Sequence, residues 1–318
     1  MLDPLDAPRI ADRYALGPDG VLEGPEARGE LGQVWRLRTA RGAWAVKEPF
    51  EASVEADARE DADFERAARA AGVPTPAVIR TIDGAVLLDL PTAQVRVFEW
   101  VDLRERDEGL DPTLVGQLTA AIHQVPFEGT RPVDPWYREP VGADRWDELV
   151  EDLTGRAASF APDLASLRDE LVALETLLEP ERALRTCHRD LWADNVRATT
   201  TGELCVIDWD NFGLADPSQE LALVLFEFGA GNPARAASLH AAYREAGGPG
   251  RLEAPGSFSM VIAQLGHIGE LACRRWLDPN ATEADRARAV GRAEEFTTRP
   301  LTRATIDELL DAVGDRAT

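Results

Sequence analysis

Lysine, cysteine and histidine are all scarce in this chain of 318 residues. Lys47 is the only lysine among 34 basic side chains. Three cysteines, an odd number without metal-type spacing, exclude a disulfide framework and favour a reduced, cytoplasmic protein. Four scattered histidines argue against a zinc site.

Long hydrophobic segments and a basic excess are also missing. The longest apolar run, around residues 221–226, is far too short to span a bilayer, and the first residues lack the basic and apolar regions of a secretory signal. With 57 acidic and 34 basic side chains, the formal net charge is -23. This balance argues against nucleic acid or an anionic membrane as a partner. It suits a cationic small molecule, although a large acidic excess more often serves solubility.

The single lysine predicts a position that arginine cannot fill. Arginine supplies nearly every other positive charge. An ammonium group is a compact point charge, whereas a guanidinium group is a planar fork, so the two are not interchangeable at a tight site. Chance is the alternative explanation.

Residues up to about 98 predict a small antiparallel sheet with one helix. Apolar and polar residues alternate over 34–38 and 43–46, on both sides of a turn at 39–42. A helix over 54–71 is expected to end at Gly72. A second hairpin and a further strand are expected over 78–79, 85–88 and 95–98.

The pattern becomes helical from about residue 110. Asp111 and Asp216 each precede a proline, which is typical of a helix N-cap followed by the first helical residue. A short hairpin is expected around Thr200–Gly202. Helices are expected near 111–125, 144–158, 163–179, 217–229, 233–246, 257–276, 282–296 and 303–313. The sequence therefore predicts an α+β fold with a β-rich lobe over 1–98, a hinge at 99–102 and a helical lobe over 103–318.

The strongest chemical signal is the segment His-Arg-Asp-Leu-Trp-Ala-Asp-Asn at residues 188–195. A short apolar strand that ends in Asp208 follows it. Phosphoryl transfer depends on positioning and charge neutralisation, and Asp190 is placed to orient the attacking hydroxyl or to accept its proton. Asn195 and Asp208 supply the hard oxygen ligands that Mg²⁺ prefers. His188 is expected to brace the loop.

Lys47 fits the same chemistry, since it ends a predicted strand from which an ammonium can reach the α- and β-phosphates of ATP. Such a lysine usually pairs with an acid on the next helix. Glu60 and Asp61 are the candidates, and Glu60 is preferred because it shares a helical face with Phe64. Glu65 is expected to be solvated.

A glycine-containing segment precedes the first predicted strand. Gly29 and Gly32 could cover the phosphates of a bound nucleotide, although the segment has neither a Walker motif nor the full protein-kinase glycine pattern. A plain turn is an equally good interpretation.

Together these motifs resemble the aminoglycoside phosphotransferase and choline kinase family. The matching segments are Val46-Lys47, Gly72-Val-Pro-Thr-Pro, Ile122-His123-Gln-Val-Pro, the 188–195 loop, Ile207-Asp208-Trp209 and Gly213 to Ala222.

The resemblance implies a bilobal, protein-kinase-like fold that binds ATP and Mg²⁺. It implies Asp190 as the catalytic residue and Asn195 and Asp208 as metal ligands. Backbone groups near Glu99 and Val101 would meet adenine. In the family, the acid that pairs with the lysine falls nearer Asp61. The Asp-Trp-Asp sequence at 208–210 and the lack of an Ala-Pro-Glu element favour a small-molecule kinase over a protein kinase.

The acceptor is less well defined by the sequence. Residues 99–160 carry 14 acids and 6 arginines, which could attract a cationic substrate or form a solvated surface. Glu227 and Glu270 lie in apolar helical runs and could bind an amine, and Trp192 could stack on a sugar ring, although a structural role is common for all three types. His123 is expected to be a core or capping residue.

Three functions agree with these features. The first is an ATP-dependent kinase of a hydroxyl on an aminoglycoside-like or other cationic antibiotic. The second is a metabolic kinase of an amino sugar, a choline-like alcohol or homoserine. The third is a catalytically silent nucleotide-binding regulatory module, which the presence of Lys47, Asp190, Asn195 and Asp208 disfavours. The sequence does not determine the oligomeric state.

Overall fold

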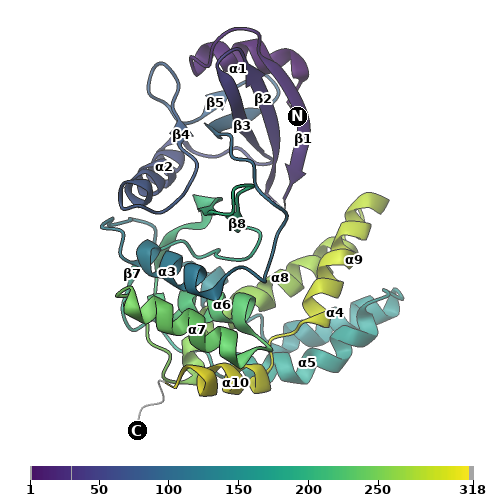
Figure 1. Ribbon diagram of the computed structural model, residues 1–318. Helices are drawn as coiled ribbons and strands as arrows, with labels where there is room; N and C mark the ends of the chain where they lie inside the picture. The colour runs from purple at the N-terminus through teal and green to yellow at the C-terminus, as the bar shows by residue number, and fades with distance from the viewer. Residues whose placement is uncertain (1, 30, 315–318) are drawn as a thin grey trace. The chain divides into compact units, whose positions relative to one another are not determined.

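Strands dominate the first hundred residues and helices the rest, as Figure 1 shows along the chain. The structure is a computed structural model that describes residues 2–29 and 31–314. Packing divides the chain into two units. The first unit contains Met1–Asp107, Val125–Gly129 and Ala193–Phe212, and the second contains Glu108–Gln124, Thr130–Trp192 and Gly213–Thr318.

The first unit is built on an antiparallel sheet with the strand order β1-β2-β3-β6-β4, and β5 also pairs with β6. The expected hairpin around residues 39–42 is confirmed as β2 and β3. The strands are β1 (Val21–Arg28), β2 (Gly32–Thr39), β3 (Gly42–Pro49), β4 (Val78–Ile79), β5 (Leu88–Asp89) and β6 (Gln94–Glu99).

The second hairpin expected in this unit is wrong. β4 and β5 flank the predicted turn, but β4 pairs with Val97 and Phe98 of β6, and β5 pairs with Gln94 and Val95. The turn itself is present, since the Thr81 carbonyl accepts from Gly84 and the Thr81 N–H donates to Ala85. β6 is long enough to pair with both short strands, so β4 and β5 do not pair with each other.

One face of this sheet carries the core of the first unit. The short helix α1 (Ala7–Arg13), which the sequence did not indicate, packs Ile10 against this core, where Trp35, Leu37 and Val97 are also buried. Side chains alternate along a strand. Lys47 of β3 therefore lies on the opposite face from the core residue Val46.

Helix α2 (Glu55–Ala70) confirms the predicted helix, but its buried face is displaced from the predicted one. Ala58, Asp61, Ala62, Glu65 and Ala68 are buried together with Phe64, whereas Ala71 is exposed. The buried face is thus centred on Asp61 and Glu65.

Residues 193–212 add a hairpin and a turn to the first unit. The hairpin consists of β8 (Val196–Ala198) and β9 (Leu204–Val206), as the sequence predicts, and a 3-10 turn, η3 (Trp209–Asn211), follows it. The Val206 N–H donates to the Pro74 carbonyl oxygen at 2.8 Å. This bond joins the hairpin to the segment that follows α2.

The second unit is mainly helical. α3 and α7 lie side by side (Figure 1), and Gly116 permits their close approach, since a Cβ there would lie 2.2 Å from the Leu239 carbonyl oxygen. Short strands β7 (Arg185–Cys187) and β10 (Gly213–Ala215) pair with each other. The helices are α3 (Pro112–His123), α4 (Ala143–Gly155), α5 (Ala161–Glu175), α6 (Pro217–Gly229), α7 (Pro233–Glu245), α8 (Ser259–Leu277), α9 (Glu283–Thr298) and α10 (Arg303–Val313).

The predicted helix caps are confirmed. Asp111 accepts from the Thr113 N–H at the start of α3, and Asp216 accepts from the Ser218 N–H at the start of α6. α6 is buried along nearly its whole length. Within residues 2–29 and 31–314, no helix has the length and apolar character needed to cross a bilayer.

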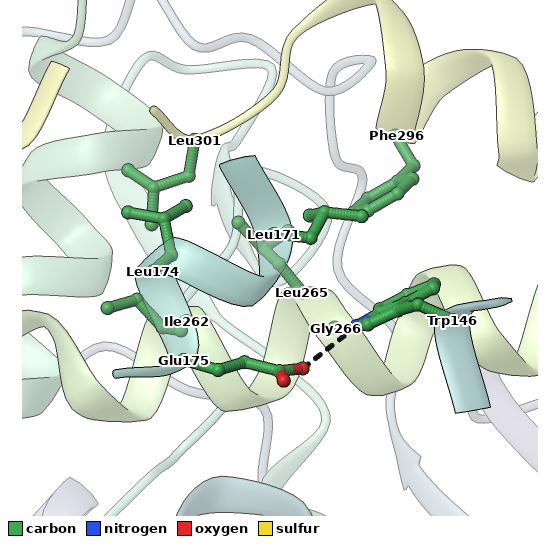
Figure 2. A pocket seen from close by; sticks show the side chains of 9 residues that line it. All are labelled: Trp146, Leu171, Leu174, Glu175, Ile262, Leu265, Gly266, Phe296 and Leu301. Carbon is green, nitrogen blue, oxygen red and sulfur yellow. Dashed lines mark hydrogen bonds between the residues drawn. The ribbon is translucent and has the colours of Figure 1, made fainter. Parts of the chain in front are cut away.

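A cavity inside the second unit is too small to be a substrate site. Its volume is about 10 Å³, which is room for at most one water molecule. Figure 2 shows its lining residues, among which Trp146 donates to the Glu175 carboxylate at 2.9 Å. Glu175 also accepts from the backbone N–H groups of Val141 and Gly142 and so connects α5 to the start of α4.

Candidate active site

In the first unit, the only lysine lies between two carboxylates of one turn. The Lys47 ammonium donates to Asp208 Oδ1 and to Asp210 Oδ2, each at 2.7 Å. The Lys47 side chain is 16% exposed. Burial alone would lower the pKa of Lys47, but the two carboxylates raise it above its usual value, so the group stays charged.

A second cation lies beside Lys47. Arg96 is opposite Lys47 on the neighbouring strand β6, is 5% exposed, and contacts both Asp61 and Asp210 at 3.0 Å. Two cations thus meet three carboxylates. This cluster can bind phosphates through its cations and a divalent cation through its carboxylates. Sequence reasoning missed Arg96 and Asp210, although the alternation of β6 places Arg96 on the same face as Lys47.

The acids of α2 have roles that differ from those expected. Asp61 is 3% exposed and contacts Arg96, whereas Glu60 is half-buried. The pairing of Lys47 with Glu60 or Asp61 stays a prediction. The expectation that Glu65 is solvated is wrong, because it is 4% exposed and accepts a 2.9 Å bond from the Thr75 hydroxyl. Burial raises the pKa of Glu65 to about 8.

The two predicted metal ligands both belong to the first unit. Asn195 is 8% exposed and precedes β8, and its carbonyl oxygen accepts from the Ile207 N–H next to Asp208. Asp208 has a left-handed backbone, with φ of 62°. The donor set of carboxylate and amide oxygens fits a hard divalent cation such as Mg²⁺.

The predicted nucleotide-contacting positions lie at the ends of strands in the first unit. Gly32 has a packing reason, since a Cβ there would lie 2.7 Å from the Glu48 carbonyl oxygen, and the Gly29 N–H donates to the Gly32 carbonyl. Glu99 ends β6, and its N–H donates to the Ala77 carbonyl. Val101 follows β6 and is half-buried. Their contacts with a nucleotide stay predictions.

A larger cavity in the first unit lies away from Lys47. It has a volume of about 460 Å³, and Gln33 and Glu48 are among its lining residues. Because side chains alternate along β3, Glu48 and Lys47 are on opposite faces of the sheet. Glu48 is also occupied, since its carboxylate accepts from the side chains of Gln33 and Trp35.

In the second unit, the loop that carries Asp190 follows β7, and a carboxylate of α6 holds it in place. Arg189 has a left-handed backbone, with φ of 66°, and its N–H donates to the buried Glu220 carboxylate. Glu220 also contacts His123 Nε2 at 2.8 Å, and the other nitrogen of His123 contacts the Tyr243 hydroxyl at 2.8 Å.

This network gives Glu220 and His123 a structural role. Burial would raise the pKa of Glu220, but its hydrogen bonds and the nearby histidines lower it, so it stays ionised. His123, Cys187 and Glu220 are close enough to one another to suggest a metal site. Both nitrogens of His123 are engaged in hydrogen bonds, however, which agrees with the core role predicted for this residue.

Asp190 has a neighbour that sequence reasoning missed. Gln264 of α8 is 3% exposed, and its amide nitrogen donates to the Arg189 carbonyl at 3.4 Å and to Asp190 Oδ1 at 3.5 Å. Tyr137 packs against the Arg189 guanidinium, and burial together with the charge of Asp190 raises the pKa of Tyr137. Gln264 is one of several polar residues in α8, and its position in the sequence gave no clear signal.

The predicted acceptor-binding residues are spread over the second unit. Trp192 is half-buried and meets Phe226 edge to face at 6.4 Å. Glu227 is buried in α6. Glu270 of α8 contacts Arg145 at 2.9 Å, so its charge is already compensated. Roles for these three residues in binding the acceptor stay predictions.

The family follows from a match over most of the chain. Residues 25–255 match the model of the phosphotransferase enzyme family. The chain belongs to this family. It is therefore a small-molecule phosphotransferase with a hydroxyl group as acceptor. No curated protein sequence matches this phosphotransferase.

Solved structures with the same fold confirm the predicted kinase-like α+β class. A spectinomycin phosphotransferase in complex with ADP and spectinomycin is 13% identical over 99% of each chain, with a TM-score of 0.69. An amicoumacin kinase in complex with AMP-PNP and Ca²⁺ is 16% identical over 95% of each chain, with a TM-score of 0.60. A microcompartment-associated aminopropanol kinase is 18% identical, covering 99% of this chain and 100% of that one, with a TM-score of 0.59.

Proposed function

We propose that this phosphotransferase uses Mg·ATP to phosphorylate a hydroxyl group of an aminoglycoside-like or other cationic antibiotic. The observation that carries the proposal is the clamp on Lys47, whose ammonium lies 2.7 Å from both Asp208 and Asp210. A lysine ammonium beside hard oxygen ligands is what binding of a metal–nucleotide complex requires.

Each residue of the first unit has a defined part. Lys47 binds phosphate oxygens as a point charge, and Arg96 balances Asp61 and Asp210. Asp208 and Asn195 would hold Mg²⁺, which when bound neutralises charge on the phosphates. Backbone groups near Glu99 and Val101 would meet adenine, and Gly29 and Gly32 would cover the phosphates.

Asp190 acts on the acceptor. Its carboxylate orients the acceptor hydroxyl and takes the proton as the new O–P bond forms and the bond to ADP breaks. Glu220 fixes the loop by accepting from the Arg189 N–H. The Gln264 amide donates to Asp190 Oδ1 and so helps to orient the carboxylate.

A cationic acceptor is supported by the charge of the chain. The net charge is -23, and residues 99–160 contain 14 acids and 6 arginines. Such a field raises the local concentration of a cation. The structurally similar spectinomycin phosphotransferase and amicoumacin kinase were solved with their antibiotics, which supports an antibiotic as acceptor.

A small amino alcohol is the second candidate. The similarity to an aminopropanol kinase over the whole of both chains favours it. Such an acceptor also carries one hydroxyl and one ammonium, so the acidic character of the chain does not separate it from an antibiotic.

The test is ADP release with Mg·ATP across a panel of acceptors. The panel contains spectinomycin, several aminoglycosides, amicoumacin, aminopropanol, ethanolamine, choline, glucosamine and homoserine. We expect one cationic compound to stimulate release, and we expect Asp190→Asn to reduce the stimulated rate by about 1,000-fold. Glu203→Gln, an exposed change in the β8–β9 turn, serves as the control that keeps full activity.

The outcomes separate the candidates. Stimulation by an antibiotic alone supports the first proposal, and stimulation by an amino alcohol alone supports the second. Equal turnover by Asp190→Asn and the unaltered protein would overturn the assigned role of Asp190. Absence of Mg·ATP binding, measured by calorimetry, would overturn the proposed nucleotide site.

A further inference from the structure

The turn that contacts Lys47 has an unfavourable backbone conformation, which contacts with other residues must stabilise. Asp208 is a non-glycine residue with φ of 62°, a backbone region that is unfavourable for an L-residue. The turn nevertheless presents Asp208 and Asp210 to the same ammonium at equal distances of 2.7 Å. A group that holds this turn therefore controls the spacing of both carboxylates.

Trp209, between the two acids, is the point at which the turn is held. It is 2% exposed, and its indole N–H donates to the Thr75 hydroxyl oxygen at 2.9 Å. Phe64 of α2 meets the indole ring edge to face, with ring centroids 5.2 Å apart. The indole N–H also lies 3.4 Å from the Val206 carbonyl oxygen, so the shorter bond to Thr75 and the contact with Phe64 act together with a local backbone acceptor to hold the ring.

Thr75 passes the constraint on to α2. It is 5% exposed, and its hydroxyl donates to Glu65 Oε1 at 2.9 Å. An indole N–H can only donate, so the Thr75 oxygen must accept from Trp209, and its single proton is left for Glu65. The bond between Trp209 and Thr75 therefore has only one possible direction.

We propose that Thr75 is a positioning residue for the site, since its hydroxyl connects the Trp209 indole to the Glu65 carboxyl and so fixes Asp208 and Asp210 around Lys47. Glu65, Thr75 and Trp209 all belong to the first unit. The proposal rests on the proposed function, in which Asp208 and Lys47 bind the metal and the phosphates. Packing alone does not require a hydroxyl group at position 75, because valine would fill the same space as threonine.

Two substitutions separate the hydroxyl from the bulk of Thr75. Thr75→Val keeps the shape and removes the hydroxyl, whereas Thr75→Ser keeps the hydroxyl and removes a methyl group. Thr119→Val is the matched control, because Thr119 is 2% exposed and its hydroxyl donates only to the Val115 carbonyl within α3. Thermal unfolding of all three variants shows whether each is folded.

The first measurement needs no nucleotide, metal or activity. Because Lys47 is the only lysine, uniform ¹⁵N labelling gives a single lysine Nζ resonance, and Trp209→Phe assigns the Trp209 indole signal. We expect Thr75→Val to shift both the Lys47 and the Trp209 signals, and Thr75→Ser and Thr119→Val to leave the Lys47 signal in place. An unchanged Lys47 signal in Thr75→Val would overturn the proposal.

The second measurement is kinetic and concerns the metal. We expect Thr75→Val to raise the Mg²⁺ concentration for half-maximal rate by about tenfold, with the acceptor KM within about twofold of the original. Thr75→Ser should restore the Mg²⁺ dependence. Equal losses in Thr75→Val and Thr75→Ser would overturn the proposal, since packing alone would then explain them. If the unaltered protein binds no Mg·ATP, the proposed function fails, and the resonances of the metal-free protein still decide whether Thr75 positions the turn.

Discussion

Lys47 is bound by two carboxylates from one turn, and this arrangement demands a point charge. A guanidinium group at position 47 would present a planar fork to Asp208 and Asp210, which approach the ammonium from two separate residues. The site therefore gives a physical reason why this one basic residue is lysine and not arginine.

We expect Lys47→Arg to be nearly as inactive as Lys47→Met. Both variants should lose about 100-fold or more in kcat/KM for ATP, because neither supplies a compact cation between the two acids. Steady-state kinetics of ADP release measures the loss. Arg59→Met, at an exposed residue of the same unit, is the control that retains activity. An active Lys47→Arg would show that charge alone is sufficient.

The buried carboxyl group of Glu65 makes the stability of the protein depend on pH. Its pKa is about 8 in the folded chain against an ordinary 4.5, because burial disfavours the charged form. Between these values the folded state binds more protons than the unfolded state, so stability falls as pH rises. The slope is on the order of 1.4 kcal/mol per pH unit.

Glu65→Gln should remove that slope. Relative to the original protein, the variant gains stability as pH rises from about 4.5 to 8, and the difference levels off above that range. Urea unfolding at several pH values measures it, with Glu203→Gln as the exposed control. Parallel stability curves for Glu65→Gln and the original protein would contradict the assigned burial effect.

At the scale of helices and strands, local signals predicted most elements and few of their partners. The caps at Asp111 and Asp216 and the β8–β9 hairpin depend on residues close in sequence, and all are confirmed. The pairing of β4 and β5 with β6 depends on distant partners, and the sequence misplaced it.

The same distinction applies to the candidate site. Asp190, Asn195 and Asp208 could be named because their chemistry follows from a short spacing. Thr75, Arg96 and Gln264 could not, because each contacts a partner far along the chain, and Glu65 could not, because its burial is not apparent from the sequence pattern. For α2 the hydrophobic pattern was misleading, since two carboxylates, Asp61 and Glu65, occupy the buried face that an apolar pattern assigns to alanine and phenylalanine.

The crossing of α3 and α7 provides a test at this scale. Gly116→Ala should destabilise the protein by about 1–3 kcal/mol, because the new methyl group would meet the Leu239 carbonyl oxygen. Gly291→Ala, in α9, should stabilise it by about 0.5–1 kcal/mol, because the described residues place no atom within 4 Å of the new methyl group. Chemical unfolding compares the two. Equal effects of both substitutions would contradict the close crossing.

At the scale of the whole molecule, the charge of -23 opposes compaction. Ion pairs at the surface are common, but 57 acids cannot all be matched by 34 basic groups. The repulsion that remains is long-range and is therefore sensitive to added salt.

We expect the melting temperature to rise by several degrees between about 0.02 and 0.3 M NaCl, because the Debye length falls below 10 Å over this range. Differential scanning calorimetry measures the change. Sucrose at matched osmolality is the control for effects other than screening. A melting temperature that is independent of NaCl would show that self-repulsion is unimportant.

The single lysine also allows the site to be modified selectively by covalent reagents. Reagents that acylate primary amines have one side-chain target in the whole chain, and that target is the Lys47 ammonium, 16% exposed and bound by two acids. Its raised pKa keeps it protonated and slow to react. Any change that loosens the Asp208–Asp210 turn should therefore register as faster acylation at one residue, which mass spectrometry of a single peptide can follow.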